Sequence, residues 1–238
     1  MPESEHLLDH LAEDLAAASL ALARAFAHGA TLWCTAPAWP SHAQHVAVEF
    51  VHPVIVGKRA FPAVAVPGHD LVNALRTLAR AGDVLLAIGA GDDEQVSSAM
   101  RRSQAWGLRT IWIGAGHGNR PRPGSSDYVL WLPGEEQIAP FSGDFVLLYH
   151  LLWELTHVAF EHPGLLSTAT ETCDDEVCIT CSDEGRLAEV VYATAGGTMI
   201  VRTPAGEEEV DATLVDGASI GDLVLVHANS AVAVVEPA

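Results

Sequence analysis

The stretch Asp83-Val-Leu-Leu-Ala-Ile88 decides the fold class, because five consecutive apolar residues are typical of a strand buried on both faces. Strands of this kind belong to parallel sheets that helices cover on both sides. Other short apolar runs lie on either side of it, separated by segments with apolar residues at helical spacing. Strands are expected over residues 31–34, 63–66, 83–88, 110–113 and 128–132, and helices over residues 5–28, 41–51, 69–81, 94–106 and 141–162. The alternation predicts an α/β fold with a doubly wound parallel sheet of the flavodoxin or Rossmann type.

The pattern changes after residue 165. Residues 166–176 form a polar, acidic stretch that we interpret as a linker. Beyond it, short apolar runs alternate with turn sequences such as Gly196-Gly197, and strands are expected over residues 187–192, 198–203, 208–212, 223–226 and 231–235. The sequence therefore predicts an α/β domain over residues 1–165, a linker over 166–176, and a small all-β, OB-like barrel over 177–238.

Composition and charge exclude several classes of protein. The 238 residues have a net charge of −19, and residues 166–238 contribute most of it with 14 acidic and 2 basic side chains. Such a surface repels phosphate backbones, so no nucleic-acid partner is expected. No apolar run reaches the length of about 20 residues that a membrane span needs, and the acidic N-terminus lacks the basic region of a secretory signal. We expect a cytoplasmic protein without a membrane partner.

The four cysteines fall into two groups. Cys34 lies in an apolar run and is expected to be a buried thiol of the core. Cys173, Cys178 and Cys181 lie together in an acidic segment, where a cytosolic Cys-x-x-Cys favours a soft metal or redox chemistry over a structural disulfide. A thiol redox module built on Cys178 and Cys181 is one of the functions that this motif allows.

Two expected helices carry histidine and carboxylate side chains on one face. The spacing by three and four residues places such side chains together at His42, His45, Glu49 and His52 of the first helix, and at His150, Glu154 and His157 of the second. Histidine and glutamate with an open position suit Zn²⁺ or Fe²⁺. The alternative is that these groups are core or interface residues whose polar atoms are satisfied by hydrogen bonds.

Residues 5–165 resemble the sugar isomerase (SIS) family, and most closely its phosphoheptose isomerases. The resemblance rests on Ala43-Gln44-His45-Val-Ala-Val-Glu49-Phe, on residues 82–88, on residues 107–113 and on the helix around His150. It implies that Glu49 and His150 move a proton between adjacent carbons of an open-chain sugar phosphate. It also implies a divalent metal, zinc or iron, at His45, Glu49 and His150, with Ser142 in place of a further glutamine ligand, and a homo-oligomer, dimer or tetramer.

The two phosphate-binding loops of that family are altered here. Thr35-Ala-Pro-Ala-Trp39 stands where the family has Gly-Asn-Gly-Gly-Ser, so a proline without an N–H and the bulk of Trp39 replace the phosphate donors. The second loop brings three carboxylates, Asp92, Asp93 and Glu94, in place of hydroxyls. We therefore expect weak phosphate binding and loss of isomerase activity. The run from Gly114 to Gly118 is expected to be a turn, and no nucleotide cofactor is expected.

The C-terminal segment resembles the HypC/HupF chaperones of NiFe-hydrogenase maturation. The resemblance covers Cys178-Ile179, Val210-Asp211-Ala-Thr-Leu-Val215 and Ile220-Gly-Asp-Leu-Val-Leu-Val-His227 in the family's order. It implies that the thiolate of Cys178 or Cys181 holds iron, that His227 ligates iron or orients a partner, and that the partner is a HypD-like maturation protein or the hydrogenase large subunit.

Two functions follow from these resemblances. The leading hypothesis is a hydrogenase-maturation accessory protein, with a HypC-like thiol module on an oligomeric SIS scaffold that binds a divalent metal. The alternative is an aldose–ketose isomerase of sugar phosphates that uses Glu49 and His150.

Overall fold

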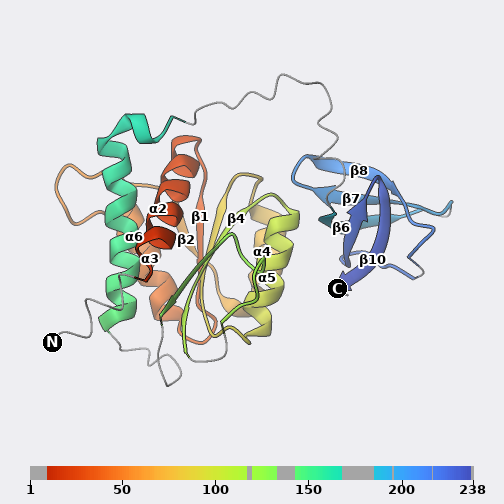
Figure 1. Cartoon of the computed structure of the whole chain (residues 1–238), viewed down its shortest axis with the longest axis horizontal. Helices are drawn as coiled ribbons and strands as arrows, with labels where there is room; N and C mark the ends of the chain where they lie inside the picture. The colour runs from red at the N-terminus through yellow and green to blue at the C-terminus, as the bar shows by residue number, and fades with distance from the viewer. Residues whose placement is uncertain are drawn as a thin grey trace. The chain divides into compact units, whose positions relative to one another are not determined.

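The computed structural model describes residues 10–116, 120–132, 143–167, 185–194, 196–215 and 217–236. The chain forms two compact units (Figure 1). The sheet unit comprises residues 1–100 with 109–168, and the barrel unit comprises residues 101–108 with 169–238. Each unit is described separately below.

The sheet unit is built on a five-stranded sheet. Its strands are β1 (Leu32–Thr35), β2 (Ala63–Ala65), β3 (Val84–Ile88), β4 (Arg109–Ala115) and β5 (Tyr128–Leu132). Their order is β2-β1-β3-β4-β5, and every neighbouring pair is parallel. The central strand β3 is buried along its whole length. The predicted parallel α/β sheet is therefore confirmed.

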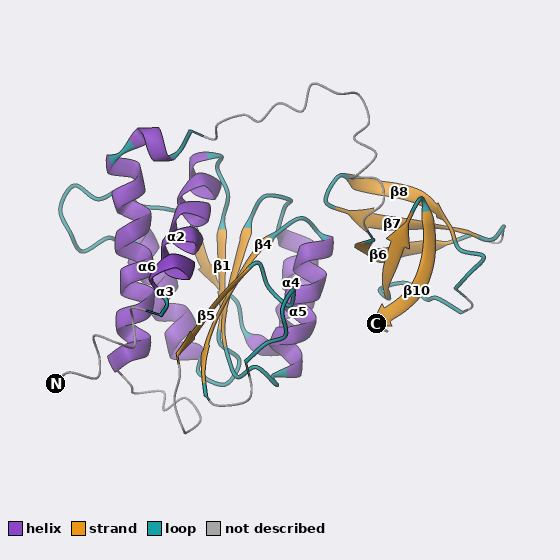
Figure 2. Ribbon diagram, viewed as in Figure 1, coloured by secondary structure: helices purple, strands orange, loops and turns teal. Residues whose placement is uncertain are grey.

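Helices cover both faces of this sheet. They are α2 (Ala12–Ala27), α3 (Pro40–Val51), α4 (Leu71–Leu78), α5 (Glu94–Ala105) and α6 (Gly143–Glu161), with the short 3₁₀ helices η1 (Gly68–Asp70) and η2 (Pro163–Leu165). In Figure 2, α2, α3 and α6 lie on one side of the strands, and α4 and α5 lie on the other. The inward side chains of α2, α3 and α6 share one apolar core with alternate residues of the strands.

Asp83, the residue just before β3, joins three neighbouring segments by hydrogen bonds. Its carboxylate accepts hydrogen bonds from the Thr31 backbone N–H (2.8 Å), the Trp33 indole N–H (2.9 Å) and the Arg80 backbone N–H (2.9 Å). Asp83 is 7% exposed, so these three donors replace the water that its carboxylate loses on folding. Asp83, the first residue of the stretch 83–88, is thus polar because its hydrogen bonds join β1, β3 and the turn between α4 and β3.

Two local expectations are corrected by the structure. Helix α3 begins at Pro40, one residue before the expected start, with Trp39 at the N-cap; proline is well placed there because the first turn needs no N–H. Gly114 and Ala115 extend β4 and do not form a turn. Glycine is required at 114 because a Cβ atom there would meet the Trp131 ring at 2.1 Å.

The barrel unit closes five strands into a ring. They are β6 (Arg186–Ala193), β7 (Thr198–Thr203), β8 (Gly206–Asp211), β9 (Leu223–His227) and β10 (Ser230–Glu236), in the closed order β10-β8-β7-β6-β9. The predicted small all-β barrel is therefore confirmed. Its interior holds small and β-branched side chains from alternate strand positions, including Val190, Val201 and Val224. Ala228 and Asn229 both have positive φ and make the two-residue hairpin between β9 and β10.

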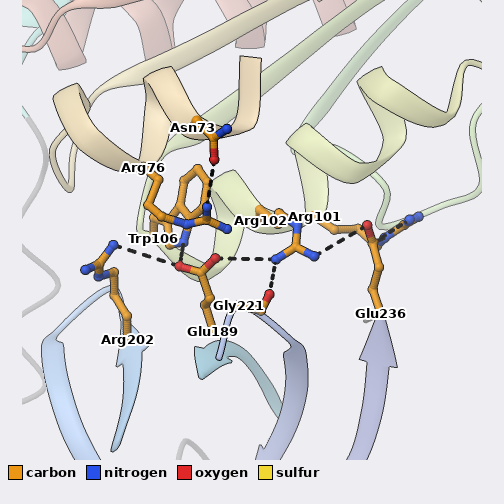
Figure 3. Close-up of polar contacts among 9 residues, drawn as sticks. All are labelled: Asn73, Arg76, Arg101, Arg102, Trp106, Glu189, Arg202, Gly221 and Glu236. Atoms are coloured by element: carbon orange, nitrogen blue, oxygen red, sulfur yellow. Dashed lines mark hydrogen bonds and ion pairs between the residues drawn. The ribbon is translucent and has the colours of Figure 1, made fainter. Parts of the chain in front are cut away.

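A buried carboxylate lies at the centre of the polar contacts of the barrel unit (Figure 3). Glu189 of β6 accepts the Trp106 indole N–H at 2.9 Å and lies 3.4 Å from the Arg102 guanidinium. Arg102 also donates to the Gly221 carbonyl, and Arg202 lies 3.9 Å from the second Glu189 oxygen. Glu189 is 2% exposed and Arg102 is 3% exposed, so the charges are paired where water cannot reach them.

None of the helices in the described ranges is long and apolar enough to cross a membrane. Cytoplasmic location stays a prediction of the sequence.

Candidate functional site

Helices α3 and α6 bring two histidines and a glutamate together. His45 and Glu49 are four residues apart on α3 and so share a face, and His150 comes from the neighbouring helix α6. Their ligand atoms all lie within 4.8 Å of one another. We call His45, Glu49 and His150 the His–Glu–His cluster. It joins residues that are about a hundred positions apart in the sequence.

Both histidines approach the same oxygen of Glu49. His45 Nε2 lies 3.3 Å from Glu49 Oε1, and His150 Nε2 lies 3.7 Å from that atom. The two imidazole rings stand edge to face, with centroids 5.1 Å apart. The Glu49 side chain is 17% exposed, whereas His45 and His150 are 39% and 38% exposed, so solvent reaches the cluster from the histidine side.

Tyr149 fixes the orientation of His45. Its hydroxyl lies 2.9 Å from His45 Nδ1 and 3.5 Å from His42 Nδ1. Burial, followed by the negative charge of Glu49, raises the pKa of Tyr149 to about 12, so the phenol keeps its proton at neutral pH. When Nδ1 of His45 carries the ring proton, it donates to the tyrosine oxygen and leaves the Nε2 lone pair toward Glu49. The sequence analysis missed this residue, because a tyrosine in an apolar helix gives no signal beyond core packing.

The donor set of the cluster fits a divalent cation. Two imidazole nitrogens and one carboxylate oxygen are the ligands that zinc and non-haem iron sites use, with further positions open to water or substrate. A histidine that ligates a metal commonly has its second ring nitrogen in a hydrogen bond, and in His45 this nitrogen is hydrogen-bonded to Tyr149. The cluster is therefore a possible metal site, composed of the three residues expected for it. Ser142 lies outside the described residues.

The other residues of the two predicted faces are not members of the cluster, although His42 shares the Tyr149 hydroxyl with His45. His42 is 6% exposed and packs against Phe145 and Tyr149. His52 is exposed and ends α3. Glu154 lies 3.4 Å from the Lys58 ammonium. Helical spacing alone thus grouped residues that the packing of α3 against α6 separates.

His157 is held by the backbone. It is 2% exposed, and its two ring nitrogens lie 2.9 Å from the Trp153 carbonyl oxygen and 3.0 Å from the Arg59 carbonyl oxygen. The hydrogen-bonded core alternative therefore describes His157.

A cleft of about 510 Å³ lies where β1 and β2 lead into the loops that follow them. Its polar lining groups are Gln44, His69 and Gln95, and no lysine, arginine, serine or threonine is among the lining residues. Pro37 and Pro40 occupy the loop between β1 and α3, and Trp39 packs against the core. The cleft presents amide and imidazole groups without a cation.

The acidic loop after β3 serves helix α5. Asp93 Oδ1 accepts the backbone N–H groups of Gln95 (3.0 Å) and Val96 (3.1 Å), which is the pattern of an N-cap. Asp92 and Glu94, the other carboxylates of this loop, are exposed. Asp93 has a structural role that the sequence analysis did not assign to it.

The cysteines divide as follows. Cys34 is fully buried and reduced, and burial raises the pKa of its thiol, so it is an inert core residue as predicted. Cys173, Cys178 and Cys181 lie outside the described residues. His227 is the last residue of β9 and is half-buried beside the Ala228-Asn229 turn.

Comparisons with known proteins identify the fold of the sheet unit. No model of a known protein family matches the chain, and no curated protein matches it. Among solved structures, a phosphoheptose isomerase from Francisella tularensis aligns over 61% of this chain and 86% of its own, with 20% identity and a TM-score of 0.51. A phosphoheptose isomerase from Neisseria gonorrhoeae aligns over 64% of this chain and 90% of its own, with 18% identity and a TM-score of 0.53. The sheet unit therefore has the SIS fold of the phosphoheptose isomerases.

Proposed function

We propose that the sheet unit is an aldose–ketose isomerase of an open-chain sugar or sugar phosphate, with the His–Glu–His cluster as its active site. The observation that carries the proposal is the placement of one carboxylate oxygen of Glu49 within 3.3 and 3.7 Å of two imidazoles. The structural neighbours named as phosphoheptose isomerases support this reaction class. The earlier expectation of lost activity rested on the altered phosphate loops, which concern substrate binding and leave the proton-transfer groups in place.

In the proposed reaction Glu49 is the base. It takes a proton from C1 of the ketose, and the electron pair of that C–H bond forms the C1–C2 double bond of an enediol. The C2 carbonyl oxygen receives a proton from His150 as its π pair moves onto oxygen. The C1 hydroxyl then loses its proton to His150 and becomes the aldehyde, while Glu49 returns its proton to C2. Every proton is restored, so the net change is isomerisation.

A divalent ion fits the same residues. His45 and His150 would hold it through Nε2, and Glu49 through one carboxylate oxygen, with the other oxygen as the base. Because Nε2 of His150 would then carry no proton, the acid role of His150 described above belongs to the metal-free site. Such an ion would polarise the substrate carbonyl. The Tyr149 hydroxyl holds the His45 ring at Nδ1, so Nε2 is the nitrogen directed at the ion.

The test is an isotope experiment on the whole protein. Sedoheptulose 7-phosphate and sedoheptulose are incubated separately in D₂O with added Zn²⁺, Fe²⁺ or Mn²⁺, and NMR follows the aldose product and deuterium at its C2. Glu49→Gln should lower the rate by about 10²–10⁴-fold, because it removes the base. Glu154→Gln, a carboxylate of α6 outside the cluster, should keep wild-type activity.

Two results would contradict the proposal. One is a wild-type protein inert toward both sugars with each metal. The other is a Glu49→Gln variant as active as wild type. The comparison of the two sugars also decides whether the cation-free cleft near Gln44 accepts phosphate.

A second candidate concerns the barrel unit, for which we propose a HypC-like role in hydrogenase maturation. It is favoured by the run Gly221-Asp222-Leu-Val-Leu-Val-His227, which enters and forms β9 of a closed barrel, in the order described for the HypC/HupF resemblance. In this role Cys178 or Cys181 holds iron as thiolate and passes it by ligand exchange to a HypD-like protein or to the hydrogenase large subunit. A dimer or tetramer of the chain would present several such thiols.

This second candidate has its own experiment. The chain is purified without oxygen after co-expression with maturation proteins, and its infrared spectrum is recorded in the cyanide and carbonyl stretching region. Bands that disappear in the Cys178→Ala/Cys181→Ala variant would support iron transfer. Bands that persist unchanged in the variant, or a blank wild-type spectrum, would count against it.

A further inference from the structure

A second cleft of the sheet unit, of about 450 Å³, lies on the face covered by α2. One wall is the last two turns of α2, and the other is the edge of the sheet where β3, β4 and β5 begin. Gly82 lies just before β3, and Arg109 and Tyr128 are the first residues of β4 and β5. Because the strands are parallel, this edge is opposite the one from which the β1–α3 loop leaves. None of the His–Glu–His cluster lines it.

The charge of this cleft is opposite to that of the chain. Its lining includes Arg24, His28 and Arg109, and no lining residue is an aspartate or glutamate. The whole chain has 31 acidic residues against 12 lysines and arginines. Two of these twelve cations therefore line one hollow that no carboxylate lines.

Hydrogen bonds orient Arg24 and His28, and each basic side chain of the cleft keeps a nitrogen atom for a ligand. Arg24 Nε donates to the Leu165 carbonyl oxygen at 3.2 Å, which fixes the plane of its guanidinium. His28 Nδ1 donates to the Arg24 carbonyl oxygen at 2.7 Å, which leaves Nε2 for another partner. Within the described part of the chain, the Arg109 guanidinium has no hydrogen bond or ion pair.

The end of α2 does not cancel this positive charge. The carbonyl oxygens of its last turn accept the backbone N–H groups of His28, Gly29 and Ala30. Its unpaired partial negative charge is therefore reduced.

We propose that this cleft binds a small organic anion through a carboxylate or phosphate group. The planar guanidinium of Arg109 suits two oxygens of either group, and Arg24, His28 and Tyr128 are the further polar residues of the lining. Ala17, Leu20 and Ala21 supply an apolar wall for the carbon part of such a ligand. The volume is in the range of small-molecule sites and exceeds the need of a bare inorganic ion.

The experiment uses the whole, metal-free protein and two probes, tricarballylate for carboxylates and inorganic phosphate for phosphates. Binding is measured by isothermal titration at low ionic strength, with sodium chloride of matched ionic strength as reference, because phosphate also stabilises proteins non-specifically. Wild type should bind one probe with a millimolar or lower Kd. Arg109→Gln should weaken binding about tenfold or more, since it removes a charged hydrogen-bond donor.

Arg122→Gln is the matched control, because Arg122 is an exposed arginine of the same unit outside the cleft. It should bind like wild type, and Glu49→Gln should also bind like wild type. The tighter probe identifies the ligand class. The proposal is overturned if neither probe binds wild type, or if Arg109→Gln and wild type bind equally.

Discussion

Tyr149, which contacts the His–Glu–His cluster, makes the stability of the fold depend on pH in the alkaline range. Its pKa is raised from 10.0 to about 12 by burial and by the charge of Glu49. The folded state therefore holds the phenolic proton more tightly than the unfolded state, and this contribution to stability is complete below pH 10. It is lost as the pH rises from 10 to about 12, and amounts to roughly 2–3 kcal/mol.

The prediction is a late phenol ionisation that belongs to Tyr149. Absorbance at 295 nm during an alkaline titration should show one phenolate forming near pH 12 in wild type, and this step should be missing in Tyr149→Phe. Tyr192→Phe, which removes an exposed phenol of the barrel unit, should keep the late step. Loss of an ionisation near pH 10 in Tyr149→Phe would contradict the assignment.

At the scale of elements, the barrel unit depends on a buried ion pair between residues 101–108 and strand β6. Replacing Glu189 by leucine leaves the buried Arg102 with only the Glu236 carboxylate, 3.8 Å away, and removes the acceptor of the Trp106 N–H. We expect a loss of about 3–5 kcal/mol in the free energy of unfolding. The double variant Arg102→Met/Glu189→Leu should recover much of the loss, because no uncompensated charge remains.

Denaturant unfolding of wild type, Glu189→Leu, Arg102→Met and the double variant measures this coupling. Arg186→Gln is the comparison, because Arg186 pairs with Glu208 at the surface of the same barrel, and such pairs contribute about 0–1 kcal/mol. A double variant that loses as much stability as the sum of the two single variants would contradict a coupled buried pair.

At the scale of the whole molecule, a metal at the His–Glu–His cluster should raise thermal stability, because it binds only where α3 and α6 are packed together. Zn²⁺ at a hundred times its Kd should stabilise the folded state by about 2.7 kcal/mol. His45→Ala should abolish the shift in Tm, and His52→Ala, on an exposed histidine at the end of the same helix, should keep it. About 0.15 M salt screens non-specific attraction to the acidic surface. Equal shifts in both variants would place the metal elsewhere.

The fold class could be predicted from the sequence because the spacing of apolar residues reflects the local geometry of strands and helices. The unbroken apolar run of residues 84–88 indicates a strand buried on both faces, and β3 is that strand. The short apolar runs beyond residue 186, separated by turn sequences, indicate strands, and β6 to β10 are those strands. Periodicity does not give the exact ends of the elements. Helix α3 starts one residue early because Pro40 suits its first turn, and β4 continues through Gly114, where only glycine fits beside the Trp131 ring.

The sequence by itself determined the parallel α/β sheet, the closed barrel, and a set of histidines and carboxylates on two helices, because periodicity and residue type are local properties. Only the tertiary structure decided which of them meet. The packing of α6 against α3 brings His150 to His45 and Glu49, buries His157 against backbone carbonyls and leaves His52 in solvent. It also brings Tyr149 to His45. The position of α2 beside the starts of β4 and β5 places Arg24 and Arg109 in one cleft. Helical spacing determines which residues share a face of a helix, but the element packed against that face determines which side chains they contact.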